Sequence, residues 1–192
     1  MAAPLLGVLA ALASVVNAIP YIRDTLRGTT RPHRATWLVW AVLAIVVCTS
    51  QRADGASWSL AMAAAQAVLT SAIFVLAIRR GEGGLSLPDV VVTAIALAGV
   101  IAWVGAGEPM AATAAVVAAD LLAAAMMCPK TYRDPRSETL ASFALASLGG
   151  ALAAGAVQTP DLALLLYPLY FCAVNAAIAI LIGYRRGVLG SP

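Results

Sequence analysis

NAIPYIRDTLRGTTRPHRATWLVW, residues 17 to 40, is an apolar segment interrupted by a proline, then a basic loop, then a second apolar segment that opens with two tryptophans. A shorter version, CPKTYRDPRSETLASF, occupies residues 128 to 143. Both stretches contain a Pro, an Arg-Asp pair and a second Pro, followed four residues later by Thr and then by an aromatic residue. Two copies of one helix, loop, helix unit are therefore expected.

The composition predicts an all-α integral membrane protein. Hydrophobic residues make up 62% of the 192-residue chain and charged residues 11%, whereas soluble domains carry about 25% charged residues. A transmembrane helix needs about 20 apolar residues. Seven segments of the chain qualify, and they span residues 3–22, 35–51, 57–78, 88–106, 109–129, 138–157 and 161–184.

The distribution of basic residues predicts the orientation in the membrane. With seven spans, eleven of the twelve Lys and Arg residues fall on one side, and Arg52 alone falls on the other. The positive-inside rule makes the basic side cytoplasmic, so the N-terminus is expected outside and the C-terminus inside a bacterial inner membrane. Because these residues are scattered over short loops without interleaved aromatics, we expect no nucleic-acid partner.

A secretory signal peptide is the alternative interpretation of residues 1 to 18, since Val16-Asn17-Ala18 could serve as a cleavage site. Such signals carry a basic region at their amino end, whereas the first arginine here is Arg23. The first helix is therefore expected to be retained.

The repeat predicts the architecture. Residues 1–81 would form one three-helix unit, residues 82–107 a linker helix and residues 108–192 a second three-helix unit. One extra helix between two copies of three gives both copies the same orientation, so the units would be parallel repeats with a site between them. Small residues in the segment 138–157 would allow close helix approach.

This arrangement of three, one and three helices, with a proline near the end of the first helix of each unit, resembles the SWEET and PQ-loop transporter superfamily. The resemblance covers the whole chain in topology and about 25 residues in motif. The Pro-Gln dipeptide that names the PQ-loop group is absent, since Tyr21 follows Pro20 and Lys130 follows Pro129. The resemblance implies transport of a small polar solute, with amide side chains on the third helix of each unit at Gln66 and Asn175.

Asp120 is the most conspicuous polar residue, because it lies near the centre of the segment 109–129. A carboxylate at the bilayer midplane costs about 2.5 to 3.5 kcal/mol on insertion scales, and such residues usually face a cavity or relay protons. We expect Asp120 to bind substrate or a proton. The alternative is a structural carboxyl group that holds a polar side chain of a neighbouring helix.

Other polar and aromatic residues in apolar segments are further candidates for substrate binding. Asn175 and Gln66 can each offer donors and an acceptor to a neutral solute, or can bond neighbouring helices instead. Asn17 could do the same, or could bond the carbonyl freed by Pro20. Trp37 is interpreted as an anchor at the membrane interface, while Trp40, one turn deeper, and Tyr170 are expected at the cavity.

Prolines and charged pairs at the basic side suggest moving parts. Pro20 and Pro129 each remove a backbone hydrogen bond near the end of a helix, so a kink or hinge is expected at each. Two Arg-Asp pairs follow these prolines and could form an inner gate across the mouth, or could remain solvated loop charges. These pairs are Arg23-Asp24 and Arg133-Asp134.

Several function classes are excluded or disfavoured. The sequence has no HExxH, GxSxG or phosphate-binding glycine loop, so an enzyme is not expected. A retinal pigment needs a mid-membrane lysine, and the only lysine, Lys130, ends a helix. No cofactor or metal is expected, because the single histidine, His33, has no ligand cluster, and the three cysteines are interpreted as small buried hydrophobes.

Two functions remain. The first is a transporter for a small polar solute that works by alternating access between the two three-helix units. Asp120 would take up a proton or meet a cationic group of the solute, the lipid bilayer would surround the protein, and a homo-oligomer is a possible assembly. The second is a non-transporting sensor, accessory subunit or scaffold with the same fold. A polar cavity that contains Asp120 would favour the transporter, and a packed apolar centre would favour the scaffold.

Overall fold

The computed structural model describes residues 2–53, 58–84, 86–106, 109–157 and 162–190. Throughout those ranges the secondary structure is helical, apart from one isolated bridge between His33 and Glu82. The elements are α1 (Ala2–Val16), α2 (Ala18–Arg27), α3 (Arg34–Ala53), α4 (Trp58–Arg80), α5 (Leu87–Ala106), α6 (Pro109–Arg133), the short 3-10 helix η1 (Pro135–Ser137), α7 (Leu140–Ala156) and α8 (Leu162–Val188). Each of the seven predicted segments coincides with a helix, the first with the pair α1 and α2.

The helices carry the apolar surface of a membrane protein. Within the described residues, three helical stretches are long and apolar enough to cross a bilayer, namely Leu5–Arg27, Ala114–Arg133 and Leu165–Val188. Large aliphatic side chains face outward, such as Ile101, which is 74% exposed, and Ile180. Contiguous apolar surface of this kind would aggregate in water and is stable against lipid. The seven-span layout itself stays a prediction.

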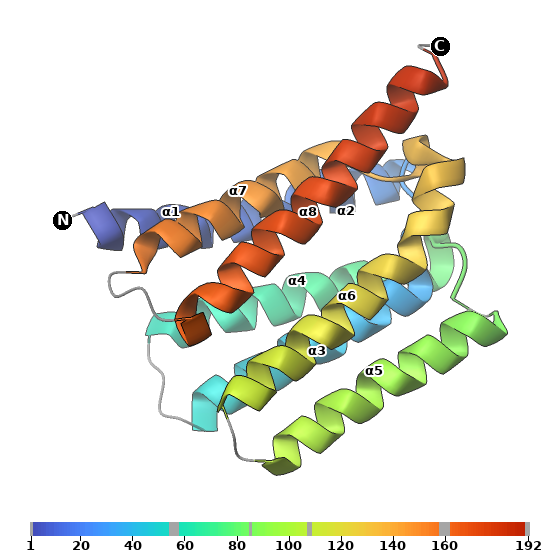
Figure 1. The fold of residues 1–192 in the computed structure, drawn as a ribbon. Coiled ribbons are helices and arrows are strands. Elements are labelled where there is room, and N and C mark those ends of the chain that lie inside the picture. The colour runs from blue at the N-terminus through green and yellow to red at the C-terminus, as the bar shows by residue number, and fades with distance from the viewer. Residues whose placement is uncertain (1, 54–57, 85, 107–108, 158–161, 191–192) are drawn as a thin grey trace.

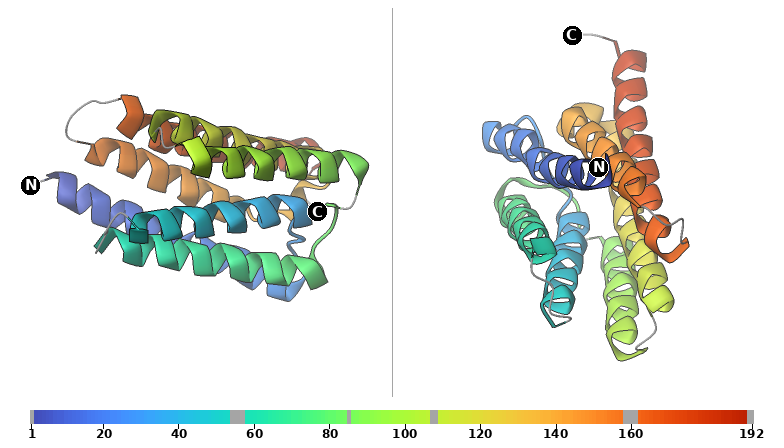
Figure 2. Two further views of the ribbon diagram at one scale, coloured as in Figure 1. Left: turned by 90° about the horizontal axis from the view of Figure 1, so that it is seen from below. Right: turned by 90° about the vertical axis from the view of Figure 1, so that its left-hand side faces the viewer.

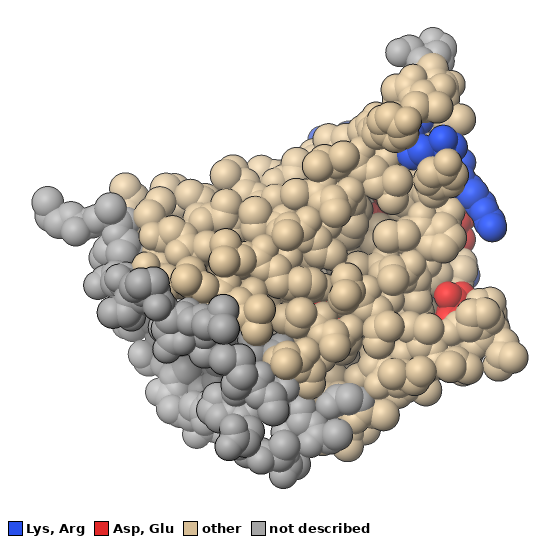
Figure 3. Space-filling model, in the orientation of Figure 1, with Lys and Arg blue, Asp and Glu red and all other residues tan. Residues whose placement is uncertain are grey.

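The helices form an up-and-down bundle. Figure 1 shows α1 with α2, α4, α6 and α8 running from left to right, and α3, α5 and α7 running back. The connections after α2, α4 and α6 therefore lie at the same end of the bundle as the end of α8. We call this the basic end, because Arg27, Arg80, Arg133 and Arg186 stand at these four helix ends. Figure 3 shows exposed Lys and Arg side chains at this end.

The third helix of each set of three contacts both of the others. In the first set, α4 packs along α3 and also contacts α1 and α2. In the second set, α8 packs along α7 and also contacts α6. Between the sets, α1 packs on α7 and α3 on α6, while α5 covers α6 and α3 from outside (Figure 2).

The predicted kink in the first helix lies at Asn17, where the chain leaves α1 and begins α2. Pro20 itself lies in the first turn of α2. A proline has no N–H to donate and its ring clashes with the carbonyl four residues earlier, here that of Val16, so the break falls one turn before it. Helix α2 ends at Gly28, whose φ of 76° is easily adopted only by glycine.

Pro129 lies inside α6, which continues to Arg133. Figure 1 shows the last turns of α6 bending away from the direction of the rest of the helix. The two prolines therefore act differently, since one separates two helices and the other lies within a continuous helix.

Helix α7 approaches α8 closely at Gly150. A Cβ atom added there would lie 2.7 Å from the backbone nitrogen of Cys172. Ser147, one turn earlier on α7, donates a hydrogen bond of 3.0 Å to the carbonyl of Cys172. The predicted role of small residues in this segment, close approach of a neighbouring helix, is found at this contact.

Candidate functional site

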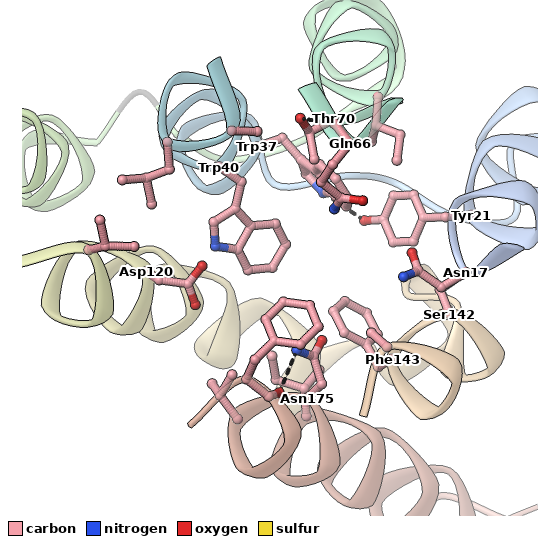
Figure 4. Close-up of a pocket in the computed structure, with 18 of the residues that line it drawn as sticks. Asn17, Tyr21, Trp37, Trp40, Gln66, Thr70, Asp120, Ser142, Phe143 and Asn175 are labelled. Carbon is pink, nitrogen blue, oxygen red and sulfur yellow. Dashed lines mark hydrogen bonds between the residues drawn. The ribbon is translucent and has the colours of Figure 1, made fainter. Parts of the chain in front are cut away.

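A cavity of about 310 Å³ lies in the middle of the bundle. Its walls come from the junction of α1 and α2 and from α3, α4, α6, α7 and α8, as Figure 4 shows. Most lining side chains are apolar or aromatic, and a few polar groups point inward between them. Concave sites with this composition are typical of small-molecule binding.

Five of the six residues predicted to bind substrate line this cavity. They are Asn17, Trp40, Gln66, Asp120 and Asn175. They come from four separate helices and the α1–α2 junction, so folding brings them together from positions far apart in the sequence. Their roles in binding stay predictions.

The sixth predicted residue, Tyr170, is the hydrogen-bond partner of Asp120. Its hydroxyl donates a hydrogen bond of 2.8 Å to Oδ2 of Asp120, joining α8 to α6. Asp120 is only 8% exposed, and it is the one charged residue among the described residues that line the cavity. Asp120 therefore does bond a side chain of a neighbouring helix, as the structural alternative predicted. This hydrogen bond uses only one of the two carboxylate oxygens of Asp120.

The amides leave part of their hydrogen-bonding capacity at the cavity. Nδ2 of Asn175 donates to the carbonyl of Phe171 at 2.8 Å, a bond within α8. Four buried polar atoms of lining residues have no hydrogen-bond partner among the described residues. They are Asn17 Nδ2, Trp40 Nε1, Gln66 Oε1 and Ser142 Oγ. The alternative in which Asn17 bonds the carbonyl freed by Pro20 is therefore not observed.

A chain of buried polar groups runs from the wall of the cavity toward the basic end. Tyr21 and Trp37 line the cavity, and Nε1 of Trp37 donates to the Tyr21 hydroxyl at 3.0 Å. The Tyr21 hydroxyl in turn donates to Oε2 of Glu138 at 2.8 Å, and Nζ of Lys130 lies 2.5 Å from Oε1 of Glu138. We call these four residues the inner lock.

Burial governs the electrostatics of the inner lock. The side chain of Glu138 is 0% exposed and that of Lys130 10% exposed. Burial raises the pKa of Glu138, and the neighbouring Lys130 ammonium opposes that shift.

Sequence reasoning missed Glu138 and Lys130 as site residues and misplaced Trp37. Trp37 is only 7% exposed and packs its ring 4.7 Å from that of Tyr21, so the predicted interface anchor is wrong. Trp37 points inward because α3 packs against α4 on one side and against α6 on another. Little of the surface of α3 is therefore left to face outward. Glu138 stands just before an apolar helix among other charges, a position typical of a solvated helix cap.

Charged residues also pair at the mouth of the basic end, where one of the two predicted Arg-Asp pairs is formed. Arg23 pairs with its neighbour Asp24 at 3.0 Å, and Oδ2 of Asp24 accepts from Thr139 at 3.2 Å. Asp134 pairs across the mouth with Arg31 at 2.6 Å. Arg133 is exposed, so the predicted symmetric arrangement of two Arg-Asp pairs is not formed.

His33 and the three cysteines are not among the residues that line the cavity. His33 is buried and lies 3.1 Å from the hydroxyl of Thr36, and its other ring nitrogen lies 3.8 Å from Asp89. Burial lowers the pKa of His33, and Asp89 opposes that shift. Across the part of the chain that the structure describes, no group of three or more His, Cys, Asp and Glu could hold a metal ion. The three cysteines are free and half-buried.

Comparison with protein-family models, with curated proteins and with solved structures finds no match for this chain. The function is therefore inferred from the residues of the site.

Proposed function

We propose that this chain is a membrane transporter for a small solute, working by alternating access between two three-helix units. The first unit comprises α1 to α4, the second α6 to α8, and α5 links them. In this proposal all seven helices cross a bacterial inner membrane, and the basic end faces the cytoplasm. A homo-oligomer is compatible with the proposal, which needs only one copy for transport.

The observation that carries the proposal is the position of the cavity. It lies between the two proposed units, near the middle of the bundle, and it contains the buried carboxyl group of Asp120. A scaffold or accessory subunit has no need of a central cavity with unpartnered polar atoms, each of which costs about 1 to 3 kcal/mol. Asp120 would take up a proton or meet a cationic group of the solute.

The helix contacts support the division into two units. In each proposed unit the third helix lies against the other two, and the first helix of either unit packs on the second helix of the other, as α1 does on α7 and α6 on α3. An approximate two-fold axis along the membrane normal would produce these reciprocal contacts. It is the arrangement expected for parallel repeats, and it supports the SWEET-like resemblance of the sequence.

The inner lock supports alternating access. Tyr21 and Trp37 come from the first proposed unit, and Lys130 and Glu138 from the second, so the lock joins the units on the basic side of the cavity. On the other side, Tyr167 near the start of α8 lines the cavity and is 40% exposed. This conformation is then closed to the cytoplasm, and inward opening requires the lock to separate.

Reconstitution tests the proposal. The purified protein is screened by thermal shift against sugars, amino acids, nucleosides and vitamins, and each solute that raises the melting temperature is tested for uptake into liposomes. We expect at least one solute to bind and to cross, and we expect Asp120→Asn to change its binding or its response to a pH gradient. If no solute class shifts the protein and none enters liposomes, the non-transporting sensor, accessory subunit or scaffold replaces the transporter.

Reporter-protein fusions test the orientation of the chain in the membrane separately. A green fluorescent protein joined to the C-terminus of the full chain is expected to fluoresce, because it folds in the bacterial cytoplasm. An alkaline phosphatase joined at the same place is expected to be inactive there. The reverse pattern would overturn the proposed orientation without affecting the transport assay.

A further inference from the structure

We infer that the central cavity binds a small organic cation, an amine or a methylated amine that carries a hydrogen-bonding group at its other end. The inference rests on the proposed function and deepens it by naming the class of solute. Its support comes from three properties of the cavity: the sign of its charge, its aromatic walls and the placement of its unpartnered polar atoms.

The charge of the cavity has one sign. Among its described lining residues, Asp120 is ionisable at physiological pH and no Lys or Arg is present. The hydroxyl of Tyr170 engages Oδ2 of Asp120, which leaves Oδ1 for a ligand. A bound anion would face this carboxylate with no cation to offset it, whereas a bound cation would compensate the cost of burying it.

Aromatic rings surround the same space. Trp40, Phe143, Tyr167 and Phe171 line the cavity, and the rings of Tyr167 and Phe171 are stacked with centroids 5.9 Å apart. Ring faces attract ammonium groups, most strongly when water is excluded, and cages of aromatic rings bind methylated amines. An uncharged sugar can donate hydroxyl hydrogen bonds to the carboxylate, but it brings no positive charge to offset the buried negative charge or to interact with the ring faces.

Two of the four unpartnered atoms, those of Asn17 and Ser142, define the other end of the ligand. Figure 4 shows Asp120 and Trp40 on one side of the cavity, and Asn17 and Ser142 on the opposite side. Nδ2 of Asn17 needs an acceptor, while Oγ of Ser142 can donate or accept. A hydroxyl or carbonyl group of the ligand would satisfy them, so the ligand is a cation at the Asp120 side and a neutral polar group at the Asn17 side.

The size of the cavity sets an upper limit. At about 310 Å³ it lies at the small end of the range of ligand pockets, about 300 to 1,000 Å³. Compounds of the size of choline or tyramine fit this limit, and a disaccharide is disfavoured.

The test compares cations with uncharged molecules of the same shape. Choline is paired with 3,3-dimethylbutan-1-ol, in which a tert-butyl group replaces trimethylammonium, and tyramine is paired with 4-propylphenol, in which a methyl group replaces ammonium. Binding to the purified protein in lipid nanodiscs is measured by calorimetry, and transport by uptake into liposomes. We expect each cation to bind at least about tenfold more tightly than its neutral partner, because both the rings and the carboxylate distinguish them.

Variants assign the preference to the cavity. Asp120→Asn keeps the size of the side chain and is expected to reduce the ratio between each cation and its neutral partner several-fold, because only the rings then distinguish the two. Asp89→Asn, which removes a carboxylate from the first turn of α5, outside the cavity, is the matched control and is expected to keep the ratio. Trp40→Leu removes a ring and is expected to weaken both cations more than Trp40→Phe does.

Equal binding of the cations and their neutral partners by the unaltered protein overturns the inference, as does binding of none of the four compounds. So does a preference that Asp120→Asn leaves unchanged. The proposed function fails separately: if the cations bind with the expected preference but none enters liposomes, the site stands and transport falls. If glucose binds and crosses while the cations do neither, transport stands and the inference falls.

Discussion

Tyr21 donates its hydroxyl hydrogen to Oε2 of Glu138 at 2.8 Å, across 117 positions of the sequence. Both residues are almost fully buried, and the same hydroxyl accepts a hydrogen bond from Nε1 of Trp37. One phenolic oxygen therefore connects α2, α3 and the segment before α7. This contact joins the two proposed three-helix units on the side of the cavity that faces the basic end.

Removing that oxygen is expected to destabilise the folded protein. Tyr21→Phe leaves a carboxylate oxygen of Glu138 and the N–H of Trp37 without their shared partner, at a cost of about 1 to 3 kcal/mol. Tyr184→Phe is the control, because Tyr184 is 67% exposed. Thermal unfolding in one detergent compares the two variants, and equal melting temperatures would show that the Tyr21 hydroxyl contributes nothing.

Lys130 and Glu138 are expected to be strongly coupled. Lys130→Met leaves a buried carboxylate without its cation, which costs about 3 to 5 kcal/mol. The double variant Lys130→Met with Glu138→Gln removes both charges, so we expect it to be more stable than Lys130→Met alone. A double-mutant cycle of unfolding free energies measures the coupling, and additive effects would contradict it.

The exposed pair at the mouth provides a comparison for this cycle. Arg31 and Asp134 lie 2.6 Å apart, but their side chains are 51% and 42% exposed. Such surface pairs contribute about 0 to 1 kcal/mol. Arg31→Gln is therefore expected to change stability much less than Lys130→Met does.

The raised pKa of Glu138 predicts the direction of a pH effect. Between the ordinary glutamate pKa of about 4.3 and the raised value in the folded protein, the folded state binds more protons than the unfolded state. Stability contributed by this group therefore rises as pH falls through that window and levels off below it. Glu138→Gln lacks the group, so the stability difference between wild type and variant should change in favour of wild type on acidification.

Melting temperatures of both proteins across the acidic range measure this difference, because contributions from other groups cancel. A change in the opposite direction would mean that the Lys130 ammonium outweighs burial and holds the pKa of Glu138 below its ordinary value.

The positions of the helices could be predicted from the sequence, because each is a long apolar run ended by charges, glycine or proline. The cavity residues could also be predicted, for a related reason. Asp120, Gln66 and Asn175 interrupt apolar runs, and a polar group in such a run is stable only where it faces another polar group or a cavity. Their spacing along the chain says nothing about distance, so their convergence on one cavity required the folded structure.

The inner lock could not be predicted from sequence, since its residues are ordinary in their local setting. Lys130 ends a helix and Glu138 precedes one, which are the positions where solvated charges are expected. Their burial follows from the loop between α2 and α3, which lies against the segment before α7. Arg31 donates its backbone N–H to the carbonyl of Ser137 there, and Thr30 and Thr139 share a hydrogen bond of 2.6 Å. The local sequence pattern around each residue does not show which loops meet in the fold.

The close approach of α7 and α8 gives a prediction that is independent of charge. Gly150→Ala would place a methyl group 2.7 to 3.0 Å from backbone and Cβ atoms of Cys172, so the helices must separate, and overpacking of this kind costs about 1 to 3 kcal/mol. Gly155→Ala on the same helix meets its nearest atom at 3.6 Å and should be neutral or slightly stabilising. Melting temperatures of the two variants test this, and equal values would contradict the close contact.

The break between α1 and α2 gives a prediction about movement. In Pro20→Ala the new backbone N–H can bond the carbonyl of Val16, which would join the two helices and turn Asn17 away from the cavity. We expect the variant to be at least as stable as wild type, since an alanine fits a helix better than a proline. We expect its rate of solute uptake to fall, because the hinge is lost.

Pro88→Ala is the matched control for this variant, since Pro88 lies in the first turn of α5, outside the cavity. Uptake into liposomes and melting temperature are measured on the same preparations of both variants. A fall in uptake with unchanged or higher stability, seen for Pro20→Ala and not for Pro88→Ala, identifies the break at Asn17 as a moving part. Uptake at the wild-type rate by a more stable Pro20→Ala would mean that the break shapes the cavity but does not move during transport.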